Sequence, residues 1–281
     1  MLAIIGGLGA ALAWAATMLL AARATRFIDA WSLLATVMTV GLLVAAPAAA
    51  LSGFPRALDG TAATWLAVSG AGNVAGLLFT YSALRVGKVG LVAPITSAEG
   101  AVAALIAVAA GEALGAAVFA TLAVIACGVA LAAIVPADDA GSRNDLRSIL
   151  LAGCGALAFG SSLYATGRVG QDLGVAWAAL PPRVVGFVAI AVPLALRRRW
   201  RMKRAALPFA VAGGLAEVVG FVSYAFGARH NLAVSAVLGS QFAAVAAVVG
   251  YVAFHERPAR HQVVGVAAIL CGVTVLGVLR S

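Results

Sequence analysis

The chain is organised around residues 72–135, which read GNVAGLLFTYSALRVGKVGLVAPITSAEGAVAALIAVAAGEALGAAVFATLAVIACGVALAAIV. Shifted by 144 positions, this stretch recurs in the second half of the chain. Rare residues match in one register: Arg85 with Arg229, Glu112 with Glu256, Gly76 with Gly220, and IACGV at Ile125–Val129 with ILCGV at Ile269–Val273. Because chance matches of such residues are uncommon, the sequence indicates an internal duplication.

The composition places the chain in a membrane. Hydrophobic residues make up 63% and charged residues 10% of the 281 residues, against about 45–50% and about 25% in soluble domains. The net charge of +9 lies in short gaps between apolar spans, so we expect a lipid bilayer as the partner and no nucleic acid. Met1–Leu20 enters a spanning pattern without a basic leader, which predicts a first helix and no cleaved signal.

Ten apolar stretches are long enough to cross a membrane, which takes about 20 residues. We predict an all-α polytopic membrane protein with spans at about 2–22, 30–51, 62–84, 89–110, 115–135, 148–167, 174–196, 206–228, 232–254 and 261–279. The first five-helix repeat covers residues 1–137, a polar linker covers 138–147, and the second five-helix repeat covers 148–281. The basic run Arg197–Arg204 is interpreted as an anchor to lipid headgroups.

An odd number of spans per repeat makes the second half enter the membrane from the opposite side. The ten helices therefore form two inverted-topology repeats, an arrangement suited to alternating access. Most of the 19 Lys and Arg residues follow the odd-numbered spans, and the positive-inside rule then places both termini outside the cytoplasm.

Several short segments at matching places in the two repeats resemble one transporter family. They are ALAW at residues 11–14, ALRVGKVGLVAP at 83–94, GE at 111–112, CGV at 127–129, HERP at 255–258, Gly265, and CGV at 271–273. With ten spans and a five-plus-five duplication, this pattern resembles the drug/metabolite transporter superfamily, and within it the EamA-like group that includes amino-acid exporters. The resemblance implies a multi-pass protein of the cell inner membrane with both termini in the cytoplasm, against the charge distribution.

Two polar stripes are related by the duplication. Asn73, Gly76 and Thr80 share one helical face of the third span. Their equivalents Glu217, Gly220 and Tyr224 share the same face of the eighth span. The stripes predict two walls of one substrate cavity, or else helix packing through small residues with polar groups as interhelical hydrogen-bond partners.

Further candidates for substrate binding come from other spans. Trp14 lies too deep in the first span to be an interfacial anchor, and Tyr164 and Gln241 add hydrogen-bonding groups to the sixth and ninth spans. Glu112 and Glu256 stand at helix starts, where carboxylates cap free N–H groups, and are interpreted as structural, with gating as the alternative.

Two charged side chains lie at similar depth in neighbouring spans. Arg183 is about 13 Å into the seventh span, and Glu217 is within about 5 Å of that depth in the eighth. An unpaired charge in lipid is unfavourable, so we predict a buried Arg183–Glu217 ion pair.

Glu99 is the predicted functional carboxylate. It lies near the middle of the fourth span, beyond Pro94, which cannot donate a backbone hydrogen bond and should bend the helix. No Lys or Arg of its own span lies at its depth. Such a carboxylate could bind a substrate ammonium or a proton, one excluding the other; the alternative is a structural Glu hydrogen-bonded to a neighbour such as Asn73.

The sequence contains no HExxH, GxSxG or P-loop motif, and Cys127, Cys154 and Cys271 read as packing residues. We therefore expect no catalytic residues, metal or cofactor, and a monomer that moves small molecules without ATP. The expected function is a secondary transporter of small metabolites, foremost amino acids, in the export direction. The alternatives are an exporter of cationic drugs or nucleotide sugars, and a lipid-modifying membrane enzyme.

Overall fold

The structure, a computed structural model, describes residues 1–53, 60–111, 115–133, 142–169, 175–228, 230, 238–239, 241–253 and 260–279. Every regular element in this part of the chain is a helix. The helices are α1 (Leu2–Ala24), α2 (Ala30–Leu51), α3 (Gly60–Val86), α4 (Val89–Thr96), α5 (Glu99–Ala109), α6 (Ala116–Ala133), α7 (Ser142–Val169), α8 (Val175–Gly186), the π-helix η1 (Phe187–Ala191), α9 (Val192–Leu196), α10 (Leu207–Ala228), α12 (Phe242–Ala253) and α13 (Arg260–Leu279).

Six helical segments within the described residues are long and apolar enough to cross a membrane. They are Leu2–Ala24, Ala30–Leu51, Gly60–Val86, Asn144–Ala165, Val175–Leu196 and Leu207–Gly227. The other four predicted spans correspond to α4 with α5, to α6, to α12 and to α13. The prediction of an all-helical membrane protein is thus confirmed, and the count of ten spans stays a prediction.

Large apolar side chains cover the outside of these helices. Leu12, Leu43 and Val188 are 62%, 71% and 60% exposed. In water such a surface would drive association, whereas lipid tails cover it without penalty. The exposed apolar surface therefore faces the bilayer.

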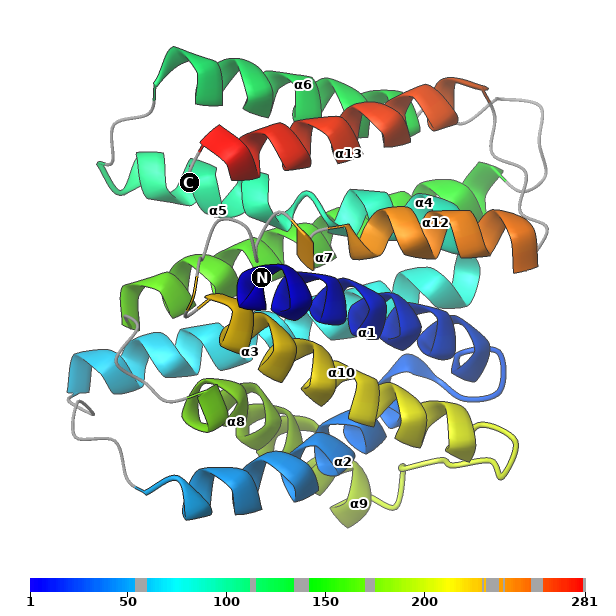
Figure 1. The fold of residues 1–281 in the computed structure, drawn as a ribbon. Coiled ribbons are helices and arrows are strands. Elements are labelled where there is room, and N and C mark those ends of the chain that lie inside the picture. The colour runs from blue at the N-terminus through cyan, green and yellow to red at the C-terminus, as the bar shows by residue number, and fades with distance from the viewer. Residues whose placement is uncertain are drawn as a thin grey trace.

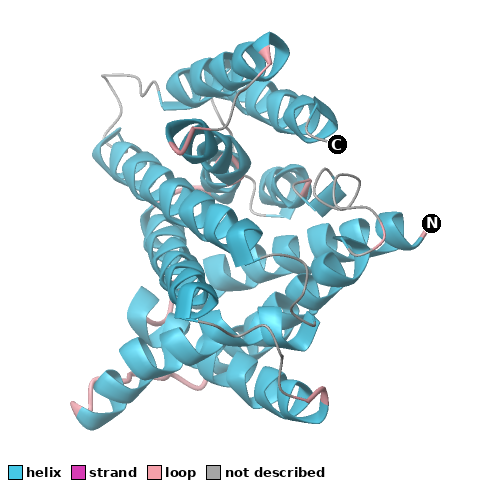
Figure 2. Cartoon of the chain, turned by 90° about the vertical axis from the view of Figure 1, so that its left-hand side faces the viewer, coloured by secondary structure: helices cyan, strands magenta, loops and turns pink. Residues whose placement is uncertain are grey.

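The helices are arranged in matched pairs (Figure 1). Helices α6 and α13 lie side by side at one end of the molecule, α2 and α8 lie together at the other end, and α1, α3, α7 and α10 lie between. Figure 2 shows the same helices in a view turned by 90°. Helix α1 packs along α10, and α3 packs along α7. A shift of 144 relates α3 to α10, and a shift of 145, which places ALAW at residues 11–14 on ALAF at 156–159, relates α1 to α7. One packing arrangement therefore occurs twice.

In each of these pairs an aromatic ring of one helix lies over a glycine of the other. A Cβ atom at Gly220 would lie 2.5 Å from Cδ1 of Trp14, and one at Gly76 would lie 2.5 Å from Cδ1 of Phe159. Both distances are too short for a side chain. Glycine at these two positions is therefore what lets the helices approach across the two halves of the chain.

The α6–α13 pair contains the same glycine–isoleucine contact twice. A Cβ at Gly128 would lie 3.0 Å from Cγ1 of Ile269, and one at Gly272 would lie 2.5 Å from Cγ1 of Ile125. Residue numbers rise along α6 as the contacted numbers fall along α13, so the two helices are antiparallel. Each half of the contact is the 144-residue copy of the other half.

The predicted fourth span is interrupted after Pro94. Helix α4 ends at Thr96 and α5 begins at Glu99. Between them the Ala98 amide donates to the Ile95 carbonyl at 3.2 Å, and the Ser97 hydroxyl donates to the Pro94 carbonyl at 2.8 Å. The missing N–H of Pro94 weakens the helix here, and the break places Glu99 at the start of a new helix.

The basic segment Arg197–Arg204 is held against the start of α2. The Trp200 indole N–H donates to the Thr36 hydroxyl at 3.2 Å, and the Arg201 amide donates to the Ser32 hydroxyl at 3.1 Å. The Lys and Arg side chains of the segment stay exposed. This leaves their charges available at the membrane edge, and their headgroup contact stays a prediction.

Helix α7 begins earlier than its apolar span suggested. It starts at Ser142, so the predicted linker 138–147 is helical from that residue on. The polar residues that marked a linker form the first turns instead, with Asp145 placed favourably near the helix N-terminus. Residues 138–141, Glu112 and Glu256 lie outside the described residues.

Candidate functional site

Five ionisable side chains from four helices form a group that we call the polar cluster. Its members are Tyr81 of α3, Glu99 of α5, Arg183 of α8, and Glu217 and Tyr224 of α10. Electrostatic interactions connect Tyr81 with Arg183 and Glu217, Glu217 with Glu99, and Glu99 with Tyr224. Helices from both halves of the chain therefore contribute to one site.

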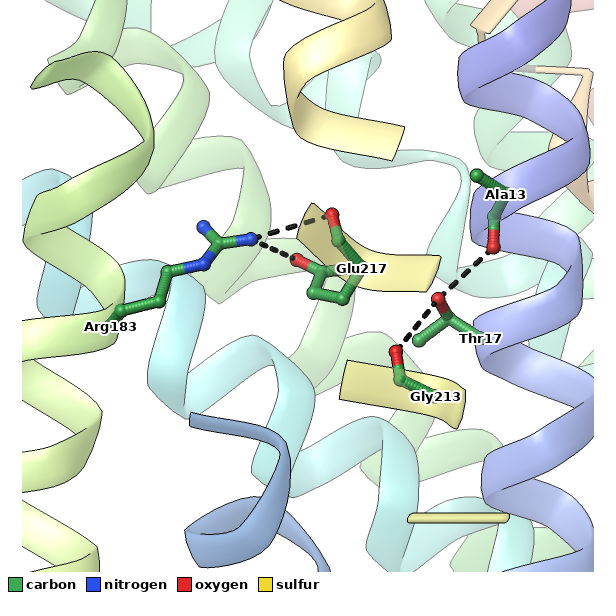
Figure 3. A network of polar contacts seen from close by, with 5 residues as sticks. All are labelled: Ala13, Thr17, Arg183, Gly213 and Glu217. Atoms are coloured by element: carbon green, nitrogen blue, oxygen red, sulfur yellow. Dashed lines mark hydrogen bonds and ion pairs between the residues drawn. The ribbon is translucent and has the colours of Figure 1, made fainter. Parts of the chain in front are cut away.

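Arg183 and Glu217 form an ion pair in the interior (Figure 3). Nη2 of Arg183 lies 3.4 Å from Oε1 of Glu217 and 3.4 Å from the Glu217 carbonyl oxygen. The two residues are 1% and 5% exposed. At this depth each charge needs the other, because an isolated charge in lipid or protein interior is strongly unfavourable.

Neighbouring residues fix the position of the Arg183 side chain. A Cβ at Gly41 would lie 2.9 Å from Cγ of Arg183, so α2 leaves room for the aliphatic stem. The guanidinium carbon lies 4.9 Å from the centroid of the Phe221 ring, within the range of a cation–π contact. The second terminal nitrogen, Nη1, is buried and has no hydrogen-bond partner.

Tyr81 is a member of the polar cluster that the sequence analysis missed. It is 1% exposed, and its hydroxyl has no hydrogen-bond partner. Buried hydroxyl groups are nearly always paired. The available signal was a tyrosine in an apolar stretch beside Thr80, off the predicted polar stripe.

Glu99 stands at the break between α4 and α5 and is partly exposed. Its carboxylate makes no hydrogen bond or ion pair with the described residues, and its electrostatic neighbours are Glu217 and Tyr224. A carboxylate placed beside another acid, with no cation, can accept a proton or an ammonium group.

Aromatic rings form a wall on the α1 and α10 side of the polar cluster. The Trp14 ring lies 5.7 Å from Tyr224 and 6.2 Å from Phe242, centroid to centroid. A Cβ at Gly239 would lie 3.4 Å from Cζ3 of Trp14 and 3.5 Å from Cδ2 of Tyr224. Trp14 and Tyr224 are only partly buried, so the wall offers flat apolar surface for a substrate side chain.

The predicted stripe of α3 remains polar and unsatisfied. Asn73 and Thr80 are 8% and 2% exposed, and Oδ1 of Asn73 and Oγ1 of Thr80 have no hydrogen-bond partner. Gly72 and Gly76, on the same helix, contact Ser162 and Phe159 of α7. The stripe therefore packs through small residues and carries unpaired polar atoms, and its role as a wall of a substrate cavity stays a prediction.

Two predicted binding residues are engaged elsewhere. Tyr164 packs edge-on against Trp65, with ring centroids 6.0 Å apart, near the start of α3. The Gln241 amide donates to the Thr274 hydroxyl of α13 at 2.8 Å. Both contacts are between helices, so these side chains hold helices together in this conformation. Sequence spacing could not reveal this, because neither Trp65 nor Thr274 lies in the same span as its partner.

No group of three His, Cys, Asp or Glu side chains that could hold a metal ion occurs in the described part of the chain. The polar cluster instead offers one cation, two carboxylates and two phenols. Such a set can bind and orient a charged small molecule.

Two comparisons with known proteins found similarity to this chain. Residues 1–134 match the model of the EamA-like transporter family. A protein of known crystal structure aligns over 97% of this chain and 95% of its own, with 22% identity and a TM-score of 0.63. At that identity the alignment shows a shared fold and nothing about function. No curated protein sequence matches the chain.

Proposed function

We propose that the chain, whose residues 1–134 match the model of the EamA-like transporter family, is a secondary transporter of amino acids. It would export them across the inner membrane by alternating access. The observation that carries this proposal is the polar cluster, in which Arg183 pairs with Glu217 and Glu99 lies in electrostatic range of Glu217.

The architecture that we propose is a pair of inverted five-helix repeats. The antiparallel α6–α13 contact supports it, since Gly128 meets Ile269 and Gly272 meets Ile125. Two elements related by a twofold axis are antiparallel where they meet only if that axis lies across them. For membrane helices such an axis lies in the membrane plane, as in inverted-repeat transporters.

The polar cluster supports a zwitterionic substrate. Glu99 supplies a negative charge for an ammonium group, Arg183 supplies a positive charge for a carboxylate, and the wall of Trp14, Tyr224 and Phe242 supplies apolar surface. When the ammonium leaves Glu99, a proton can take its place, and this exchange would couple export to proton entry. The break at Pro94 gives α5 a joint at which Glu99 can move relative to α4.

A second function is favoured by one observation. Glu99 has no cation partner among the described residues and lies near Tyr224 of the aromatic wall. This pair would also suit a cationic drug, which carries no carboxylate. The two functions differ in whether the substrate needs a negative group.

Counterflow in proteoliposomes tests both functions. Vesicles with purified protein are loaded with each of the twenty unlabelled amino acids and exposed to the same labelled compound, and protein-free vesicles serve as the control. We expect exchange of at least one amino acid, faster when a proton gradient is imposed. Exchange of quaternary ammonium dyes with no exchange of any amino acid would overturn the proposal in favour of the cationic alternative.

A further inference from the structure

Two buried donors in the polar cluster have no acceptor. Nη1 of Arg183 and the hydroxyl of Tyr81 lack hydrogen-bond partners, although each residue is 1% exposed. Leaving such a group unpaired in the interior is unfavourable, so native structures nearly always provide a partner. Two unpaired buried donors on neighbouring helices point to a hydrogen-bond acceptor that binds between them.

The two donors belong to neighbouring helices, since α3, which carries Tyr81, packs against α8, which carries Arg183. Tyr81 also interacts electrostatically with both members of the Arg183–Glu217 pair. Nη2 of Arg183 is directed at Glu217 at 3.4 Å, and Nη1 is the other prong of the planar guanidinium fork. A fork of this kind accommodates a carboxylate particularly well.

We infer that Nη1 of Arg183 and the hydroxyl of Tyr81 bind the carboxylate of the transported substrate. This inference rests on the proposed transport of amino acids and adds the residue that reads the carboxylate. The substrate ammonium then binds Glu99, the carboxylate with no cation partner among the described residues. Glu217 pairs with Arg183 and neutralises it while the site is empty.

The other unpaired polar atoms of α3, in Asn73 and Thr80, do not bind the carboxylate. Oδ1 of Asn73 is an acceptor and repels a carboxylate, and the Thr80 hydroxyl faces Gly155 of α7, where a Cβ would lie 2.9 Å from it. Arg183 is the one cation among the described members of the polar cluster. The carboxylate subsite is therefore assigned to Arg183 and Tyr81.

The test measures recognition of the carboxylate separately from transport. The amino acid that exchanges fastest in the counterflow panel is used as labelled substrate. The same amino acid and its carboxamide compete with it, unlabelled, at mildly acidic pH where both carry an ammonium group. The measured quantity is the ratio of the two inhibition constants, which reports the contribution of the negative charge.

Three proteins are compared with the wild type. Tyr81→Phe removes only the hydroxyl. Thr121→Val is the matched control, because it removes a buried hydroxyl of α6 that donates to Ala117 within its own helix at 2.8 Å. Arg183→Gln with Glu217→Gln removes both charges together and so leaves no unpaired charge behind.

We expect the wild type to prefer the amino acid over its carboxamide by at least about tenfold, the order expected of one charge-assisted hydrogen-bonded contact. Tyr81→Phe should reduce this preference several-fold, the double variant should abolish it, and Thr121→Val should leave it unchanged. If Tyr81 and the ion pair had a purely structural role, their variants would exchange amino acids more slowly, but the ratio of the two inhibition constants would not change.

An unchanged ratio in Tyr81→Phe, or a wild type that binds both competitors equally, overturns the inference while amino-acid transport stands. Tyr81→Phe keeps the test decisive even where the double variant does not fold, because it leaves the ion pair intact. Failure of the proposed function looks different: the wild type then exchanges no amino acid, and the inference falls with it.

Discussion

Helices α3 and α10 occupy positions related by the 144-residue shift, yet matching faces carry different chemistry. Both faces have a glycine under an aromatic ring of the other half, Phe159 over Gly76 and Trp14 over Gly220. One turn before the glycine, α3 has neutral Asn73 and α10 has Glu217, which pairs with Arg183. The packing is duplicated and the charge is not.

This difference separates what the fold needs from what the site needs. Symmetric packing requires equal residues at both crossings, because each helix meets the equivalent partner. A bound molecule with a positive and a negative end has no such symmetry, so the residues that bind it must differ between the halves. The charged members of the polar cluster lie where the duplication is broken, and each prediction below perturbs one side of a matched pair.

The largest effect is expected at the charged member of the first pair. Glu217→Gln leaves Arg183 buried without its anion, which destabilises folded proteins by about 3–5 kcal/mol. Asn73→Ala, at the matching position, removes an unpaired oxygen and should cost less than about 1 kcal/mol. The loss of stability of both variants is measured by thermal unfolding in detergent, with the folded fraction determined by size-exclusion chromatography.

The double variant Arg183→Gln with Glu217→Gln provides the control. Removing both charges should restore at least half of the stability lost in Glu217→Gln. A double variant no more stable than the single one would mean that the two side chains do not interact.

The Arg183–Glu217 pair could be predicted from the sequence because the depth of a residue in a membrane span follows from counting residues along the span. Arg183 and Glu217 had to lie at similar depth, and burial made pairing the favourable outcome. The membrane class followed from composition, and the resemblance to the EamA-like family from short segments in both halves. The orphan hydroxyl of Tyr81 could not be anticipated, because it depends on side chains of α8 and α10 that are distant in sequence. The engagement of Gln241 by Thr274 depends likewise on how α12 meets α13.

The next effect is expected at both glycine crossings equally. Gly76→Ala and Gly220→Ala each push a Cβ to 2.5 Å from an aromatic carbon, and overpacking of this kind costs about 1–3 kcal/mol. Gly153→Ala in α7 is the control, because nothing lies within 4 Å of its added Cβ and alanine favours helix by up to about 1 kcal/mol. A large loss at one crossing and none at the other would show that the two contacts are not equivalent.

A smaller effect, on transport and not on folding, is expected at Glu99. Glu99→Gln keeps the shape and removes the charge, so amino-acid exchange should slow about tenfold, equivalent to about 1.4 kcal/mol, and lose its response to pH. Glu217 and Tyr224 are the titratable groups in electrostatic range of Glu99, and both stay in place. Asp145→Asn makes the same chemical change near the start of α7 and should leave exchange unaltered. Normal exchange with normal pH dependence in Glu99→Gln would reduce Glu99 to a packing residue.

The smallest effect is expected where the same interhelical hydrogen bond occurs twice with different lengths. The Ser162 hydroxyl donates to the Ser69 carbonyl at 2.7 Å, and its counterpart, the Thr17 hydroxyl, reaches the Gly213 carbonyl at 3.4 Å (Figure 3). Thr17 also donates to Ala13 in its own helix at 3.0 Å, so little of its bonding capacity goes to α10. Hydrogen bonds between membrane helices are worth about 0.6 kcal/mol on average. Ser162→Ala should therefore cost about 0.5–1 kcal/mol, and Thr17→Val a few tenths at most, measured by the same detergent unfolding. If Thr17→Val destabilised the protein more than Ser162→Ala, the α1–α10 crossing would depend on its interhelical hydrogen bond and the α3–α7 crossing would not. Hydrogen bonding would then not be a feature that the two crossings share.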